Sequence, residues 1–105
     1  MWRDDGSPPG GLYERVLASR RAQLHLQIGV RLEAGYGPQA RDMAAELAMH
    51  FVHGRDARRA VQYCRLAGEN ALQRSAHQEA VGHFTTAMEL LVMLAEAAEH
   101  AGQVE

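Results

Sequence analysis

Small apolar side chains recur every three or four residues between Asp56 and Arg74, a spacing that places them on one face of an α-helix. They are Ala60, Cys64, Ala67 and Ala71. Asp56 stands where an N-cap is needed, because its carboxylate can accept the first free backbone N–H groups. Since small side chains let neighbouring helices approach closely, we expect this helix to be the central one of the fold.

A second helix is predicted over Ala76–Leu94, where a wider apolar stripe follows the same period. Its members are Ala80, Phe84, Ala87, Leu91 and Leu94. Ser75 and Gln78 match a capping box, so Ser75 is the predicted N-cap. The two helices, separated by so short a turn, should form an antiparallel hairpin.

The first half of the chain predicts three further helices. A short apolar stretch over 12–18 is followed by Ser19, which we interpret as the N-cap of a new helix running from Arg20 to Gly35. That helix places Leu24, Ile28 and Leu32 on one stripe. Pro38 suits the first turn of the next helix, and Gly54 suits its end.

The sequence therefore predicts an all-α fold of about five helices, arranged as antiparallel helical hairpins. The Gly/Pro-rich segment 1–11 is predicted to be a flexible arm, residues 12–94 the helical domain, and residues 95–105 a fraying polar tail. A length of 105 residues suits one such domain.

Composition excludes several classes of function. Eleven basic and thirteen acidic residues give a net charge of -2, which provides no general attraction for nucleic acid or an anionic membrane. Cys64 is the only cysteine, so no internal disulfide can form. We recognise neither a signal peptide nor an apolar span of membrane length, and therefore expect a cytoplasmic protein without a membrane partner.

The stretch from Val61 to Leu91 resembles a tetratricopeptide repeat, in which small residues mark the closest helix contacts and an aromatic residue follows on the second helix. Gly68, Ala80, Phe84 and Ala87 stand at the matching mutual spacings. The pattern departs from the family at Ala71 and His77, where aromatic residues are usual, and at Val92, where proline is usual. The resemblance implies a tetratricopeptide-like α-solenoid fragment.

A longer region, about 12–94, resembles helices of large bacterial regulatory ATPases. The resemblance is carried by Ser19-Arg20-Arg21-Ala22-Gln23-Leu24-His25, by Leu47-Ala48-Met49-His50-Phe51, by Gly54-Arg55-Asp56 and by Arg59-Ala60-Val61-Gln62-Tyr63. It implies a segment of a signalling or transcriptional regulator. The sequence contains no glycine-rich phosphate loop and no lysine, so we expect no nucleotide cofactor and no ATP hydrolysis by this chain.

Candidate catalytic and metal-binding residues are each better explained by structural roles. His50 and His53 are three residues apart, a spacing compatible with metal binding, but no third ligand is near in sequence. Cys64 lies within a stripe of small residues, which favours a buried hydrophobe over a nucleophile. An enzyme would need Glu46 to join these histidines in a cluster that only tertiary structure could form.

The leading hypothesis is a non-enzymatic protein-interaction or scaffold module, with no metal or cofactor, that binds a protein or peptide. Uncovered apolar surface on a terminal helix would favour a homodimer. The alternative is a helical nucleic-acid-binding regulator that uses the cluster Arg15, Arg20, Arg21 and Arg31, although the net charge disfavours it.

Overall fold

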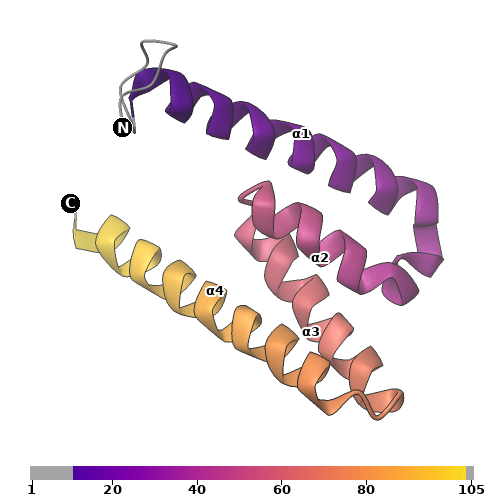
Figure 1. The fold of residues 1–105 in the computed structure, drawn as a ribbon. Coiled ribbons are helices and arrows are strands. Elements are labelled where there is room, and N and C mark those ends of the chain that lie inside the picture. The colour runs from indigo at the N-terminus through magenta and orange to yellow at the C-terminus, as the bar shows by residue number, and fades with distance from the viewer. Residues whose placement is uncertain (1–10, 104–105) are drawn as a thin grey trace, which may run out of the picture.

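Every regular element in residues 11–103, the part of the chain that the computed structural model describes, is helical (Figure 1). This range contains four α-helices and one 3-10 helix: α1 Leu12–Tyr36, η1 Gly37–Met43, α2 Ala44–His53, α3 Ala57–Gln73 and α4 His77–Gln103. The all-α prediction is confirmed. The predicted count of five helices is not confirmed: the two helices expected before Gly35 are one α-helix, and Pro38 lies in the first turn of η1, a short 3-10 helix that precedes α2.

Helices α3 and α4 form the predicted antiparallel hairpin, and α3 lies between α2 and α4 (Figure 1). Asp56 caps α3, since its carboxylate accepts the backbone N–H of Arg59 at 3.2 Å. The small stripe of α3 is buried along its whole length, from Ala60 to Ala71. Burying small residues on the central helix brings its neighbours close to its backbone.

Ser75 is not the N-cap of α4, so that prediction is wrong. It has a positive φ of 60° and ends α3, where its N–H bonds to the Leu72 carbonyl while the Ala76 N–H bonds to Ala71. An N-cap needs an extended backbone, which a residue with this φ cannot have. The carbonyl of Ala76 accepts the Ala80 N–H instead and begins α4.

Ser19 is not an N-cap either, because α1 runs through it without interruption. The predicted core stripe of α1 is also wrong in part: Leu24 and Ile28 are 54% and 42% exposed, and of that stripe only Leu32 packs against the core. The buried residues of α1 are Ala22 and Gly29. Because α1 carries apolar residues on both sides, periodicity alone could not choose the buried one.

Two glycines determine how closely α1 approaches α2. A Cβ at Gly29 would lie 2.9 Å from the Phe51 ring. A Cβ at Gly54, which follows α2, would lie 2.8 Å from the backbone nitrogen of Leu26 in α1. The helices therefore meet at distances that only residues without a side chain permit.

The core is built mainly from α2 and α3, with Leu47 and Phe51 as its largest fully buried side chains. The Cα radius of gyration is 17.0 Å, against about 13 Å for a compact chain of this length. The first half of α1 and the last half of α4 extend beyond the central helices on the same side of the molecule (Figure 1). Both halves therefore have little tertiary support.

The predicted domain limits change at the C-terminal end. Residues 95–103 continue α4 and do not form the expected frayed tail. The predicted arm over 1–11 lies outside the described residues, except for Gly11.

Candidate interaction surfaces

The residues predicted to pack the repeat lie together between α3 and its neighbours. Ala60, Cys64, Ala67, Ala80 and Ala87 are at most 5% exposed, and Gly68 is also buried. Phe84 is partly buried, and its ring occupies the space where a side chain at Gly68 would be: an added Cβ would lie 2.6 Å from it. Gly68 and Phe84 thus bring α3 and α4 into close contact.

Cys64 is 2% exposed, and burial raises the pKa of its thiol. The neutral thiol is therefore favoured over the thiolate, which is the nucleophilic form. It belongs to the buried hydrophobic core cluster together with Ala60 and Ala67. This environment matches a packing role.

A polar network fastens α1 to α3. The Tyr63 hydroxyl donates to Glu33 Oε2 at 2.6 Å, and Arg59 Nε lies 3.2 Å from Glu33 Oε1. Arg59 also binds Asp56 at 2.8 Å and covers the Phe51 ring, which stacks on Tyr63. Burial and the Glu33 carboxylate raise the pKa of Tyr63 to about 12. The network holds Glu33 and Tyr63 in fixed positions.

Two further contacts fix the α1–α2 corner. The Tyr36 hydroxyl donates to Glu46 Oε1 at 2.6 Å, a bond that raises the pKa of Tyr36. The amide of Asn70 donates to the Arg41 carbonyl at 2.9 Å and ties η1 to α3. The hydrogen bond from Tyr36 gives Glu46 a structural role, and that role explains its position without a catalytic one.

Three histidines meet where α1 crosses α2: His50 and His53 of α2, and His25, which is distant from them in sequence. His25 Nδ1 lies 3.2 Å from His50 Nδ1, and the His25 and His53 ring centroids are 5.1 Å apart. The sequence did not predict that His25 contacts His50 and His53, although His25 lies on the same face of α1 as the buried residues Ala22 and Gly29. Within residues 11–103, no group of three or more His, Cys, Asp or Glu side chains could hold a metal ion.

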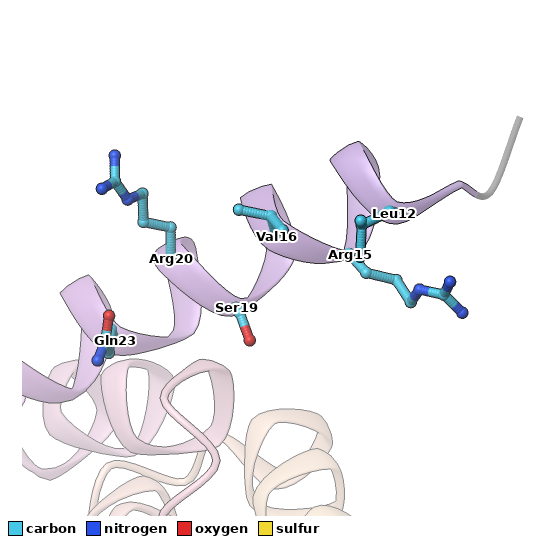
Figure 2. Close-up of a pocket in the computed structure, with 6 residues that line it drawn as sticks. All are labelled: Leu12, Arg15, Val16, Ser19, Arg20 and Gln23. Atoms are coloured by element: carbon cyan, nitrogen blue, oxygen red, sulfur yellow. The ribbon is translucent and has the colours of Figure 1, made fainter. Parts of the chain in front are cut away.

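The four arginines of α1 do not form one basic face. Arg15, Arg20, Arg21 and Arg31 are all exposed, but at 100° per residue they spread over about 220° of the helix. Figure 2 shows Arg15 and Arg20 pointing away from each other, around a shallow depression that is lined by α1 alone. A surface made by a single helix encloses no ligand.

Helix α1 instead presents an apolar surface on the side opposite Ala22 and Gly29. We call it the α1 outer face; its members, Tyr13, Val16, Leu24 and Ile28, are 62%, 52%, 54% and 42% exposed. They span an arc of about 120°. Arg20 and Arg31 lie within the same arc, so this face is both apolar and basic.

Helix α4 carries a second uncovered surface, which we call the α4 outer face. Val81, Met88, Leu91 and Val92 are 64%, 66%, 51% and 55% exposed and span an arc of about 100°. Leu91 was predicted to face the core but remains exposed, as do Val92 and Met93 beside it. By length and composition alone, His77–Gly102 could cross a membrane, contrary to the expectation that no such span exists.

Over residues 11–103, the fold and these surfaces define an all-helical protein with two exposed apolar helix faces. No protein-family model, curated protein or solved structure matches it.

Proposed function

We propose that this chain is a non-enzymatic protein-interaction module built of tetratricopeptide-like helix pairs. The observation that carries the proposal is the exposure of the α1 and α4 outer faces. Monomeric proteins rarely expose large contiguous apolar patches, and such patches mark sites where other proteins bind. Eight apolar residues, each at least 42% exposed, make up the two faces.

The repeat-like character of the proposal rests on the α3–α4 pair. Phe84 packs onto Gly68, and small residues fill the helix contact. In helical repeats each unit buries one face against the next, so an end unit without a neighbour keeps an uncovered face. The outer faces of α1 and α4 have the positions expected of such surfaces.

The proposed setting is a bacterial signalling or transcriptional regulator of the ATPase type, on the basis of the sequence resemblance given above. In such a protein the module would connect a switch domain with a sensor or output domain. The nucleic-acid alternative receives no support from the dispersed arginines of α1 or from the net charge of -2.

Capture experiments with matched variants test the interaction role. The immobilised chain should retain specific proteins from a lysate of its own cells, and Met88→Glu on the α4 outer face should abolish retention of at least some of them. Met49→Glu is the control, because Met49 is 42% exposed on α2, outside both faces. Equal retention by all three proteins, or retention of nothing by wild type, would refute the proposal.

A further inference from the structure

The two outer faces carry opposite charges. The α1 outer face contains Arg20 and Arg31, and Arg21 lies at its edge. Glu99 lies within the arc of the α4 outer face, and Glu89 and Glu96 border it. Helix α4 has no arginine or lysine at all. Each face could therefore pair with the other through apolar contacts flanked by ion pairs.

The faces also match in length. From Tyr13 to Ile28 the α1 outer face runs for about 22 Å; from Val81 to Val92 the α4 outer face runs for about 16 Å, and Glu99, farther along the same side of α4, brings the total to about 27 Å. If the two faces pack against each other, the apolar and charged positions of α1 therefore lie opposite those of α4 over most of the contact. Two helices can pack in this way over several turns.

The faces cannot meet within one molecule, because α1 and α4 make no backbone contact and the α2–α3 pair separates them (Figure 1). We propose that the α1 outer face binds the α4 outer face of a second copy of this chain. The contact is head-to-tail, so it places α4 of one copy beside α1 of the next. This inference rests on the proposed function and names one partner for it.

Other occupants fit the charges less well. Pairing α4 with α4 would bring Glu89, Glu96 and Glu99 towards their own counterparts, and pairing α1 with α1 would do the same for Arg20 and Arg31; like charges in contact are unfavourable. Insertion of α4 into a membrane would place Glu89, Glu96 and Glu99 in or near the hydrocarbon layer, which is costly for a carboxylate. Only the head-to-tail contact brings opposite charges together.

Two blocked variants test the proposal directly. Leu24→Glu with Ile28→Glu blocks the α1 outer face, and Met88→Glu with Val92→Glu blocks the α4 outer face; all four residues are at least 42% exposed. Circular dichroism verifies that both stay helical. Analytical ultracentrifugation then measures the mass of wild type, of each variant, of their equimolar mixture and of the Met49→Glu control.

The proposal predicts that wild type and Met49→Glu gain mass with concentration, that each blocked variant is monomeric, and that their mixture forms a one-to-one dimer. That dimer is possible because each variant retains the face that the other lacks. If a blocked variant does not fold, Arg31→Glu and Glu96→Arg replace it. Each alone should weaken association by about two- to five-fold, and the double variant should restore it.

Several results would overturn the proposal. Self-association of the α1-blocked variant alone would indicate an α4–α4 contact, and binding of wild type to phosphatidylcholine vesicles through the α4 outer face would indicate a lipid partner. Wild type that is monomeric at every concentration would exclude self-association. The proposed function would survive that last result if capture of another protein still depended on Met88.

Discussion

Gly54→Ala tests how α1 is attached to the rest of the fold. Gly54 is buried, with a φ of -81° that alanine adopts without strain. The new Cβ would lie 2.8 Å from the nitrogen and 2.9 Å from the Cα of Leu26. These are backbone atoms, so no side-chain rotation can relieve the contact, and α1 itself has to move.

The size of the effect follows from that displacement. Ordinary contacts between heavy atoms begin at about 3.5 Å, so α1 must withdraw by roughly 0.7 Å. A gap of this size forfeits about a quarter to a half of the dispersion energy of each contact, including those of Gly29 with Phe51. Overpacking of this kind costs about 1–3 kcal/mol. For a domain of this size, 2 kcal/mol lowers the melting temperature by about 8–16 °C.

Urea and thermal unfolding, followed by circular dichroism, measure the change. Gly82→Ala is the matched control, because Gly82 lies in α4, is exposed and has nothing within 4 Å of an added Cβ. Alanine there should stabilise the helix by up to about 1 kcal/mol. If Gly54→Ala proved as stable as wild type while Gly82→Ala behaved as expected, the close approach of α1 would be disproved.

Three further predictions concern α3 and its contacts. Gly68→Ala should destabilise the protein by about 1–3 kcal/mol because of Phe84, and Phe84→Leu should recover part of that loss in a double-mutant cycle of urea unfolding. The pKa of Tyr63 is about 12 in the folded protein against about 10 unfolded, so its contribution of about 3 kcal/mol should be complete below pH 10 and should be lost as the pH rises through 12. Tyr63→Phe, which cannot ionise beside Glu33, should flatten the pH dependence of unfolding; an unchanged slope would contradict this account. Ser75→Gly should stabilise by about 1 kcal/mol, since glycine adopts a positive φ freely, and a loss of stability would show that the Ser75 side chain is needed.

The α3–α4 hairpin could be predicted because its information is local. The small residues of α3 lie on one side only, and Asp56 caps α3 with one carboxylate oxygen while the other binds Arg59 in the same turn. Serine is less informative, since it caps helices, lies within them and ends them. Ser19 lies within α1, and Ser75 follows the end of α3.

Tertiary contacts between distant residues could not be predicted. Glu33 meets Tyr63 from thirty positions away, and His25 meets His50 from twenty-five. A glutamate next to Leu32, which packs against the core, was a sequence signal for such a partner, because a carboxylate near a core needs a donor. Helical periodicity did not predict that Tyr63 is the donor. It also did not predict which face of α1 is buried, since Leu24 and Ile28 face away from α2.

Amide hydrogen exchange, followed residue by residue, tests the central claim that the outer faces are binding surfaces. The first half of α1 and the last half of α4 have little tertiary support, so their amides should exchange faster than those of α3 in dilute protein. When the protein is concentrated or a captured partner is added, exchange should slow in 13–28 and 81–99 and stay unchanged in α3. Slowing that is confined to α2 and α3, or absent from both outer faces, would contradict the account.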